Sequence, residues 1–590
     1  MKVLLVSLNA KFIHSSLALR YIFEYCSHYK EQMKVLELTI NHEENDLIKE
    51  IYQESPDVIG FSCYIWNMQQ IKTLIPILKE LLPQTQIILG GPEVSYDAQT
   101  LFDELPIDGV MLGEGEATWA DYMAYLNNTG LDRSAIDGLI YREAHKVIVN
   151  KPRKPMALSE LPFVYGDLTG LEHKIMYYEA SRGCPFSCQY CLSSAEKGVR
   201  FMPLERVKEE LGYFLAHKVK QIKFVDRTFN ANKGYAIAIW DYLIQNDNGH
   251  TNFHFEIAAE LIDEVMLDCL KDARPGLIQF EIGVQSTNPE VLKIIKRPMP
   301  FEEIKSVVLA VKSLGNIHQH LDLIAGLPKE DFASFRRSFN DVISLRPEQF
   351  QLGFLKLLHG SGLRRDARMH GIRYKAQPPY EVLYTKEVSF SEMLCLHQIE
   401  ELLERYYNSE RFKLSLEYLF ALSESPFDFF HDLSNYWQSK GYDKIQHKKA
   451  SYYLKLVEFA QTQPSVDLTT IKELVRLDWL LNEPIKEMPN ELLTLEQSAY
   501  KTQNNSWLRD DAYMIEVLKR NPEYTARQRL RKMHIEWFSI AIEDFYHEIK
   551  SGSMSAITSL IKSDKPYPVL IDYTENNTCL FLHAEVHYDL

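Results

Sequence analysis

The stretch Ser181-Arg-Gly-Cys-Pro-Phe-Ser-Cys-Gln-Tyr-Cys-Leu192 holds three of the eight cysteines of the 590-residue chain. They follow the spacing C-x3-C-x2-C, at Cys184, Cys188 and Cys191. The apolar run 175–180 before them is typical of a β-strand, so the sequence predicts that the cysteines lie on the loop leaving a strand. Three thiolates on one tight loop can bind one soft metal centre.

The missing fourth ligand narrows the kind of metal centre. A structural zinc site has four protein ligands, and an electron-transfer [4Fe–4S] cluster normally has four cysteines. Three cysteines leave one iron open to an exchangeable ligand, which favours a cluster that takes part in chemistry. A structural zinc site and a disulfide stay open as alternatives, although closely spaced thiols in a chain of cytosolic character are more often metal ligands or catalytic.

Composition gives the broad class. The formal charge of −16 argues against a protein that coats nucleic acid, although a local basic patch could still bind RNA. The basic run 527–532 is one such cluster, for which a solvated helix face is the favoured interpretation. No apolar run approaches the ~20 residues of a membrane span. We expect a cytoplasmic protein of about three to four domains that does not contact membranes.

Residues 1–130 alternate between predicted strands and helices. The predicted strands are 2–8, 33–39, 57–62, 86–90 and 109–112, and the intervening predicted helices are 16–29, 43–53, 67–82 and 98–105. Strict alternation predicts a doubly wound, Rossmann-like parallel sheet, whose ligands bind at the carboxyl ends of the strands. Glycines follow two of these strand ends, where they let the backbone approach a bulky ligand.

The alternation resumes in residues 171–385, after a stretch at 131–170 that we interpret as a linker with a small hairpin. Six predicted β/α units indicate a partial (β/α)6 barrel of the TIM type, with functional side chains at the carboxyl ends of its strands. Residues 386–590 are predicted to be mostly helical, with one helix at 526–549 and a hairpin at 567–583. The fold class is therefore α/β with a helical C-terminal domain.

The cysteine spacing resembles that of the radical S-adenosylmethionine (radical SAM) enzymes, and Tyr190 before the third cysteine fits the same pattern. In that family the fourth iron of a [4Fe–4S] cluster chelates SAM, and an electron from the cluster cleaves SAM to a 5′-deoxyadenosyl radical. The resemblance implies that the three cysteines are metal ligands and catalytic. It implies SAM contacts at positions that match motifs of relatives of coproporphyrinogen oxidase and the methylthiotransferases: Tyr190, Glu256, Gln285, Arg297 and Asp322.

These residue types suit SAM on chemical grounds. A zwitterion with a ribose needs a carboxylate for its ammonium group, an arginine fork for its carboxylate, and amide or acid groups for its hydroxyls. Asp226 is less specific, because it could equally be the N-cap of the following helix.

The first domain resembles the cobalamin-binding domain that precedes many radical SAM enzymes. The resemblance implies these cobalamin-binding residues: Asn9, His14, Ser62, Tyr64, Gly90, Gly91, Pro92, Glu93, Gly113, Glu114, Gly115 and Glu116. Ser62 matches a serine of the nucleotide-tail pocket. The motif Asp-x-His-x-x-Gly, which supplies a cobalt ligand in the mutases, is absent. His14 is therefore a candidate ligand, with a pocket or surface histidine as the favoured alternative, and a domain without any ligand is the alternative for the whole domain.

The C-terminal part is similar to an uncharacterised helical domain attached to some of these proteins. Just before it, His359, Tyr380 and Glu381 could face a substrate, handle protons or relay a radical, although a structural seam is the favoured interpretation. The sequence does not choose among small-molecule, peptide, lipid and RNA substrates.

The two motif sets together predict a cobalamin-dependent radical SAM enzyme. Its radical would abstract hydrogen from an unactivated carbon, methylcobalamin would deliver a methyl group, and a second SAM would remethylate cobalt, with electrons from a reductant such as flavodoxin or ferredoxin. Three alternatives remain open: a radical reaction in which cobalamin only carries electrons, a radical SAM enzyme without cobalamin that modifies RNA or a tetrapyrrole, and a non-enzymatic protein that binds a cluster or a corrin.

Overall fold

The structure is a computed structural model. It describes residues 1–144, 146–194, 198–297, 299–518, 524–540, 542–543, 545–547, 562–573 and 578–582. The chain forms two compact units, of which the first comprises Met1–Pro347 with Gln351–Met393 and the second Glu348–Phe350 with Leu394–Leu590. Within the described ranges, no helix is long and apolar enough to cross a membrane.

The first unit begins with a seven-stranded sheet in the order β2-β1-β3-β4-β5-β6-β7. Its parallel strands are β1 (Val3–Asn9), β2 (Met33–Thr39), β3 (Val58–Ser62), β4 (Gln86–Gly90) and β5 (Gly109–Met111). The hairpin β6 (Leu139–Glu143) and β7 (Lys146–Val149) continues this sheet, because β6 pairs antiparallel with β5. Part of the stretch that we interpret as a linker thus belongs to the first sheet.

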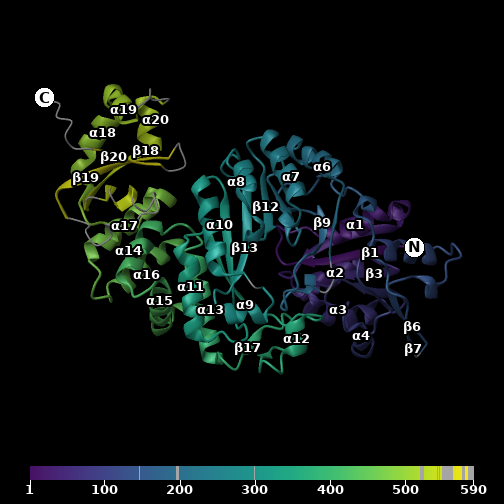
Figure 1. Ribbon diagram of the computed structural model, residues 1–590. Helices are drawn as coiled ribbons and strands as arrows, with labels where there is room; N and C mark the ends of the chain where they lie inside the picture. The colour runs from purple at the N-terminus through teal and green to yellow at the C-terminus, as the bar shows by residue number, and fades with distance from the viewer. Residues whose placement is uncertain are drawn as a thin grey trace. The chain divides into compact units, whose positions relative to one another are not determined.

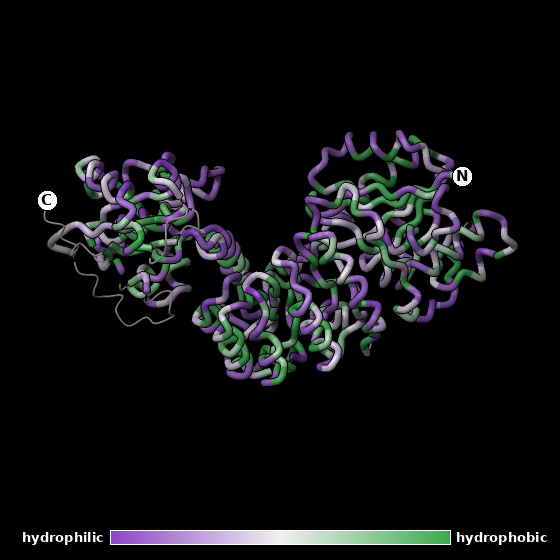
Figure 2. The backbone as a smooth tube through the Cα atoms, turned by 90° about the horizontal axis from the view of Figure 1, so that it is seen from above, coloured by the Kyte–Doolittle hydropathy of each residue, from purple (hydrophilic) through white to green (hydrophobic). Residues whose placement is uncertain are grey.

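Helices cover both faces of this sheet, as a doubly wound fold requires. Helices α1 (Leu17–Tyr25) and α5 (Glu116–Leu126) pack on one face, and α2 (Glu44–Glu54), α3 (Met68–Leu81) and α4 (Ala98–Glu104) on the other. Figure 2 shows the strands as the apolar centre of this layer. A β-carbon at Gly60 would overlap the ring of Trp119, so this glycine lets α5, which the sequence pattern did not predict, pack directly on β3.

The second sheet has six strands in the order β15-β14-β13-β12-β11-β8. They are β8 (Met176–Tyr178), β11 (Gln221–Phe224), β12 (Asn252–Ile257), β13 (Ile278–Gln285), β14 (His318–Ala325) and β15 (Gln349–Phe354). The main helices between them are α6 (Leu204–Ala216), α7 (Lys233–Gln245), α8 (Glu264–Leu270), α9 (Pro289–Ile294), α10 (Phe301–Leu314) and α11 (Phe332–Ser344), several of which lie outside the strands in Figure 1. The predicted partial barrel is confirmed.

A small hairpin that was not predicted follows the first barrel strand. It consists of β9 (Ser181–Cys184) and β10 (Gly198–Phe201), paired antiparallel. Gly183 has φ +102°, and a β-carbon there would overlap the carbonyl of Gly198. The first cysteine therefore ends a hairpin strand rather than a barrel strand.

The second unit is mostly helical. Its helices include α14 (Lys413–Leu422), α15 (Pro426–Lys440), α16 (Lys449–Ala460), α17 (Leu468–Asn482), α18 (Lys501–Arg509), α19 (Asp511–Leu518) and α20 (Ala526–Lys532), and α13 (Phe390–Tyr406) leads into it. A sheet in the order β18-β19-β20 joins them, formed by β18 (Met533–Ile540), β19 (Lys562–Asp572) and β20 (Thr578–Phe581). The last two strands confirm the predicted hairpin, although position 583 lies outside the described residues.

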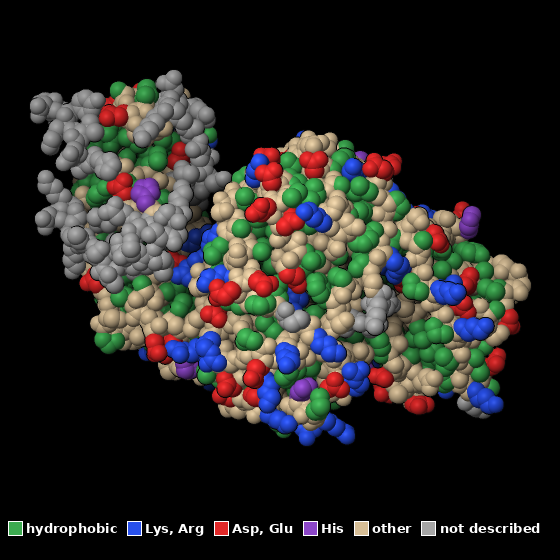
Figure 3. Space-filling model, in the orientation of Figure 1, with side chains coloured by type: hydrophobic (Ala, Val, Ile, Leu, Met, Phe, Trp, Pro, Cys, Tyr) green, Lys and Arg blue, Asp and Glu red, His purple; other side chains and the backbone are tan. Residues whose placement is uncertain are grey.

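The single helix predicted at 526–549 is wrong. Helix α20 ends at Lys532, and β18 follows at once and pairs antiparallel with β19. The strand is rich in Ile and aromatic residues, which fit a pleated, half-buried surface, and this pairing outweighs the helical periodicity. Arg529 is not solvated, because it is buried and ion-paired with Asp511. Elsewhere on the face shown in Figure 3, acidic and basic side chains are interspersed.

Candidate functional site

The three cysteines of the C-x3-C-x2-C loop lie beside two polar side chains. Cys188 is buried, whereas Cys184 and Cys191 are half-buried, and no disulfide is found in the described part of the chain. The Oγ1 atom of Thr228 lies 3.4 Å from Sγ of Cys184, and Nη1 of Arg297 lies 4.0 Å from Sγ of Cys188. Burial raises the pKa of the Cys188 thiol, and the Arg297 charge opposes that rise by favouring the thiolate.

The spread of the thiols separates a cluster from a mononuclear ion. Among the described residues, the one group of three His, Cys, Asp or Glu side chains whose ligand atoms all lie within 4.8 Å of one another is His254, Glu281 and His320. Four thiolates around one zinc lie about 3.8 Å apart, given a Zn–S distance of about 2.3 Å. At least two of the three thiol sulfurs are therefore more than 4.8 Å apart, which fits a polynuclear cluster better than a single zinc ion.

The cysteines share one cavity of about 160 Å³ with every residue predicted to contact SAM. The predicted residues that line it are Cys184, Cys188, Cys191, Tyr190, Glu256, Gln285, Arg297 and Asp322. We call it the cluster cavity. Sequence reasoning missed Arg227, Thr228 and Glu281, which also line it. Arg227 and Thr228 directly follow the end of β11, so the rule that ligands bind at strand ends could have found them.

Gln285 and Arg297 face each other in this cavity. Gln285 ends β13 with φ 70°, a left-handed conformation that is rare outside glycine, and the β13–β14 register shifts there. Its side chain folds over Gly283, where a β-carbon would overlap Nε2 of Gln285 and lie 3.8 Å from Nη2 of Arg297. The buried Nε of Arg297 has no hydrogen-bond partner in the described part of the chain. These donors fit a polar ligand such as the carboxylate of SAM.

Two acids of the cluster cavity, Glu256 and Asp322, have a raised pKa, whereas hydrogen bonding to His254 and the charge of Lys223 lower the pKa of the third, Glu281. Burial raises the pKa of Glu256 to about 7, and Arg227 only partly opposes this effect. Burial also raises the pKa of Asp322, whose Oδ1 lies 3.1 Å from Nε2 of His320. A cationic ligand would compensate these carboxylates, so they fit the ammonium group of SAM.

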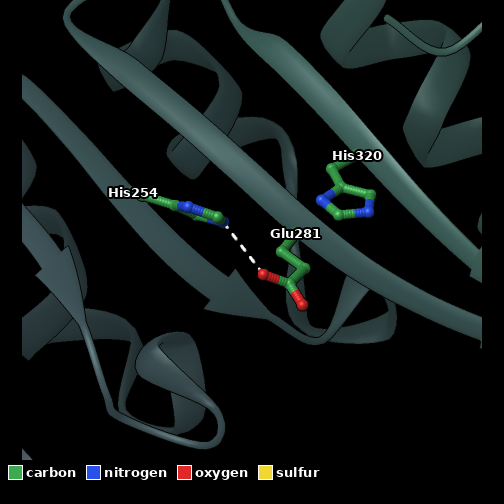
Figure 4. A group of neighbouring side chains, drawn as sticks. All are labelled: His254, Glu281 and His320. Atoms are coloured by element: carbon green, nitrogen blue, oxygen red, sulfur yellow. Dashed lines mark ion pairs between the residues drawn. The ribbon is translucent and has the colours of Figure 1, made fainter. Parts of the chain in front are cut away.

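Next to this cavity, the barrel interior holds His254, Glu281 and His320 on the adjacent strands β12, β13 and β14 (Figure 4). Nε2 of His254 lies 3.0 Å from Oε2 of Glu281. The same carboxylate oxygen lies 3.0 Å from Nζ of Lys223. Two imidazoles and a carboxylate form a donor set that suits several metals. Here Lys223 already supplies a positive charge to Glu281, so we interpret the group as an ion-pair network inside the barrel and not as a metal site.

A larger cavity of about 690 Å³ opens at the carboxyl ends of the first sheet, and we call it the corrin cavity. Nine of the residues predicted to bind cobalamin line it: Asn9, His14, Tyr64, Gly91, Pro92, Gly113, Glu114, Gly115 and Glu116. Ser62 and Gly90 line an adjoining cavity of about 100 Å³, which shares Tyr64 and Gly91 with the larger one. Buried oxygens of Ser16 and Glu116 lack partners in the described structure, which fits a polar ligand.

Aromatic side chains line the floor of the corrin cavity. Tyr64 and Trp66 stack with ring centroids 4.4 Å apart. His14 is held from the barrel side, because its Nδ1 lies 2.6 Å from the hydroxyl of Tyr177 on β8. Burial lowers the pKa of His14, so the imidazole stays neutral and its free nitrogen is Nε2. A ligating histidine normally has its other nitrogen hydrogen-bonded in this way.

Arg182, two residues before Cys184, ties the cysteine hairpin to the first domain. Its guanidinium lies 2.6 Å from Glu116, 2.9 Å from Glu179 and 3.5 Å from Glu114. Arg200 on β10 pairs with Glu114 as well. Burial raises the pKa of Glu179 to about 7, against the opposing charge of Arg182. The charges of Arg182 and Arg200 are thus compensated within the protein.

Asp226 anchors the same hairpin and is not a helix N-cap. Its carboxylate accepts hydrogen bonds from Oγ of Ser181 at 2.6 Å and from the backbone N–H of Ala180 at 3.0 Å. Thr228 is the N-cap residue of the short helix that follows. Asp226 therefore fixes the start of β9, and with it the position of the first cysteine.

Four predicted site residues, Glu93, His359, Tyr380 and Glu381, line none of the three cavities described above. The hydroxyl of Tyr380 donates to Glu93 at 2.9 Å, and Nδ1 of His359 lies 2.5 Å from Asp97. Glu381 pairs with Lys375 at 3.0 Å. Through His359 and Tyr380, the segment after the barrel thus forms a seam against the loop 91–97 of the first domain. These contacts favour the structural interpretation over the substrate-facing one, and the ligand role of Glu93 stays a prediction.

Comparison with known families agrees with this geometry. Residues 3–122 match the B12 binding domain, residues 178–342 match the Radical SAM superfamily, and residues 368–557 match a protein family of unknown function, DUF4080. The chain is a radical SAM protein with an N-terminal B12-binding domain. The uncharacterised C-terminal domain that the sequence resembles is the DUF4080 domain.

Relatives of this radical SAM protein include methyltransferases. An uncharacterised methyltransferase of Pyrococcus horikoshii is 29% identical over 302 residues, which are 48% of this chain and 64% of the relative. The cobalamin-dependent radical SAM methyltransferase TokK of Streptomyces tokunonensis is 25% identical over 324 residues, which are 51% of this chain and 47% of the relative. The chain thus spans about half to two thirds of the length of these relatives.

A solved structure extends the likeness over nearly the whole fold. The cobalamin-dependent radical SAM enzyme OxsB, solved with aqua-cobalamin and SAM, matches with a TM-score of 0.56 and 15% identity. The match covers 94% of this chain and 84% of OxsB. The domains and the donor sets of the two cavities account for three cofactors, which are a [4Fe–4S] cluster, SAM and cobalamin.

Proposed function

We propose that this protein is a cobalamin-dependent radical SAM enzyme that methylates an unactivated carbon of its substrate. The observation that carries the proposal is the pair of cavities. The cluster cavity gathers three cysteines and every predicted SAM contact, and it meets the corrin cavity at one shared side chain, Arg227. A radical formed in one cavity and a methyl donor held in the other would act on a substrate between them.

When bound, the cofactors would supply the chemistry: the cluster would provide the electron that cleaves SAM to methionine and a 5′-deoxyadenosyl radical, and cobalamin would provide a methyl group taken from a second SAM. In sum, one substrate C–H, two SAM and two electrons give the methylated product, methionine, 5′-deoxyadenosine and S-adenosylhomocysteine. We propose that a one-electron donor such as flavodoxin or ferredoxin supplies the electrons in the cytoplasm.

The side chains of the chain itself hold and orient these groups. Cys184, Cys188 and Cys191 would bind three irons and leave the fourth to SAM. Glu256 would hold the ammonium group of SAM and Arg297 its carboxylate. Arg182 and Arg200 would face the corrin with their carboxylate partners already in place.

Anaerobic reconstitution tests the proposal. The reconstituted protein is expected to hold iron, sulfide and one corrin, and to form 5′-deoxyadenosine from SAM after reduction. With methyl-deuterated SAM and a fractionated metabolite and RNA extract of the source cells, a product in which a CD3 group replaces one hydrogen of its precursor is expected. A protein that carries the cluster but binds no cobalamin would refute the cobalamin half of the proposal.

The Cys184→Ala variant separates an enzyme from a binding protein, with Cys269→Ala as the matched control for losing a half-buried thiol elsewhere. SAM cleavage is expected to vanish in the first variant and to persist in the second. 5′-Deoxyadenosine that persists in Cys184→Ala would contradict the assignment of the cluster ligands. Unlabelled product formed together with 5′-deoxyadenosine would instead indicate a radical reaction without methyl transfer.

A further inference from the structure

Arg227 occupies the junction of the two cavities. Of the described residues, it is the one whose side chain lines both the cluster cavity and the corrin cavity. Both chain neighbours of Arg227 are fixed by contacts. Asp226 accepts a hydrogen bond from Oγ of Ser181, and Oγ1 of Thr228 lies 3.4 Å from Sγ of Cys184. Arg227 therefore lies on a fixed loop, three residues beyond the end of β11, at the place where the two cavities meet.

The charge of Arg227 is barely compensated within the protein. Its side chain is 58% exposed, and the one ion pair found in the described structure joins Nη1 to Oε1 of Glu256 at 3.9 Å, beyond hydrogen-bond distance. Because burial raises the pKa of Glu256 to about 7, that partner is only partly ionised near neutral pH. No hydrogen bond of the guanidinium to any described residue is found.

The other arginines of the corrin cavity give the contrast. Arg182 is 15% exposed and lies within 3.5 Å of three carboxylates. Arg200 is 31% exposed, pairs with Glu114, and donates to the carbonyl of Met156 at 2.5 Å. Both are occupied by structural partners, whereas the five N–H donors of Arg227 are left for a ligand.

We propose that the substrate is a small organic anion whose carboxylate or phosphate group is bound by Arg227. A guanidinium presents two parallel N–H donors that match either group, and such charge-assisted pairs are stronger and more directional than neutral hydrogen bonds. Pairing at the junction would place the rest of the substrate between the two cofactors. The inference rests on the proposed function, because it assumes that both cavities serve one substrate.

The first arm of the test measures binding. Arg227→Gln removes the charge, Arg227→Lys keeps the charge without the fork, and Arg200→Gln is the matched control for losing an arginine of the same cavity. In cluster- and cobalamin-loaded protein, the ³¹P line of inorganic phosphate or the ¹³C line of labelled acetate is expected to broaden with the wild type and with Arg200→Gln, and not with Arg227→Gln. The line that broadens tells phosphate from carboxylate, and equal broadening in all proteins would overturn the proposal.

Cofactor affinity in the same variants excludes two other ligands. Dissociation constants of SAM and cobalamin are expected to change less than threefold in Arg227→Gln. A tenfold weaker SAM affinity would assign Arg227 to the SAM carboxylate, and a tenfold weaker cobalamin affinity would assign it to the corrin. Either result would overturn the proposal.

The second arm measures turnover with methyl-deuterated SAM and cell extract that has been separated on an anion exchanger at pH 7. The label is expected in products of the retained fraction, with kcat/KM about 10- to 100-fold lower in Arg227→Gln, the range of a hydrogen-bonded charge pair. Label in products of the unretained fraction would show that the substrate is not an anion, which would overturn this proposal and still support methyl transfer. A retained fraction could instead stimulate 5′-deoxyadenosine formation in the wild type but not in Arg227→Gln, without transfer of label. That result would support an anionic substrate bound by Arg227 and would refute methyl transfer.

Discussion

The two cavities differ in how the protein treats their charges. Around the corrin cavity, Arg182 and Arg200 are paired with Glu114, Glu116 and Glu179, so these two cations have their partners before any ligand binds. In the cluster cavity, burial holds the pKa of Glu256 near 7, and Nε of the buried Arg297 lacks a hydrogen-bond partner among the described residues.

This difference distinguishes charged groups that hold the protein together from charged groups that are available to bind a ligand. Compensated charges hold two domains together. Uncompensated groups are costly while the cavity is empty and become favourable when a zwitterion supplies their partners. The comparison predicts that substitutions at the corrin cavity affect folding first and that substitutions in the cluster cavity affect ligand binding first.

The largest expected effect is functional and confined to the cluster cavity. Cys184→Ala removes a thiolate that no neighbouring cysteine can replace, so the cluster is expected to lose iron and SAM cleavage to fall below detection. Cobalamin affinity should stay at the wild-type value, because Cys184 does not line the corrin cavity. Iron content, 5′-deoxyadenosine yield and cobalamin absorbance measure the three quantities, and a simultaneous loss of cobalamin binding would break the comparison.

The next effect is on stability. Arg182→Met leaves buried carboxylates without their cation, and removal of one partner of a buried ion pair costs about 3–5 kcal/mol of unfolding free energy. Denaturant unfolding of the unloaded protein measures this loss. Arg200→Met is the matched control, with a smaller expected loss, because Arg200 is more exposed and Glu114 keeps Arg182 as a partner. Equal losses in the two variants would contradict the compensating role of Arg182.

The loss in Arg182→Met should depend on pH. The folded pKa of Glu179, about 7, already lies above its ordinary value of 4.5, and the variant removes the charge that lowers it. An acid with a raised folded pKa binds its proton more tightly in the folded state, so stability falls as the pH rises past 4.5. The deficit of Arg182→Met relative to the wild type is therefore expected to be larger at pH 8 than at pH 6.

The third effect concerns SAM affinity. With a pKa of about 7, Glu256 is mostly protonated at pH 6 and mostly ionised at pH 8, and only the carboxylate attracts an ammonium group. SAM should therefore bind about tenfold more tightly to the cluster-loaded protein at pH 8 than at pH 6. Equilibrium dialysis at the two pH values measures this ratio. Glu256→Gln should bind SAM weakly at both values, and a wild-type affinity without pH dependence would contradict the assignment.

How much of each cavity could be predicted from the sequence depends on whether a residue is placed by its own strand or by contacts with distant segments. Three of the residues expected to contact SAM, Glu256, Gln285 and Asp322, lie in the carboxyl-terminal halves of the consecutive parallel strands β12, β13 and β14, and these ends of a parallel sheet meet at one edge. Glu256, Gln285 and Asp322 were therefore brought together as predicted. The glycines at 91, 113 and 115 lie in the corrin cavity for the same reason.

What could not be predicted depends on contacts between distant segments. The hairpin of β9 and β10 pairs residues across a loop, and β18 becomes a strand only because β19 pairs with it. Glu93 follows a strand end like its neighbours, yet its carboxylate turns away to the hydroxyl of Tyr380, which lies 287 positions further along the chain. No local periodicity carries information of that kind.

That long-range bond gives the smallest of the expected effects. Tyr380→Phe leaves the buried carboxyl of Glu93 without its donor, which should cost about 1–2 kcal/mol of unfolding free energy. Burial raises the pKa of Glu93 and the Tyr380 hydroxyl opposes that rise, so the deficit should grow as the pH rises and the carboxylate ionises. Tyr384→Phe, at an exposed tyrosine, is the control and should leave stability unchanged.

Because Glu93 adjoins Gly91 and Pro92, which line the corrin cavity, cobalamin affinity in Tyr380→Phe should weaken only a few-fold, and SAM affinity should not change. A large loss of cobalamin affinity without loss of stability would show that Glu93 binds the corrin and that the seam is not purely structural.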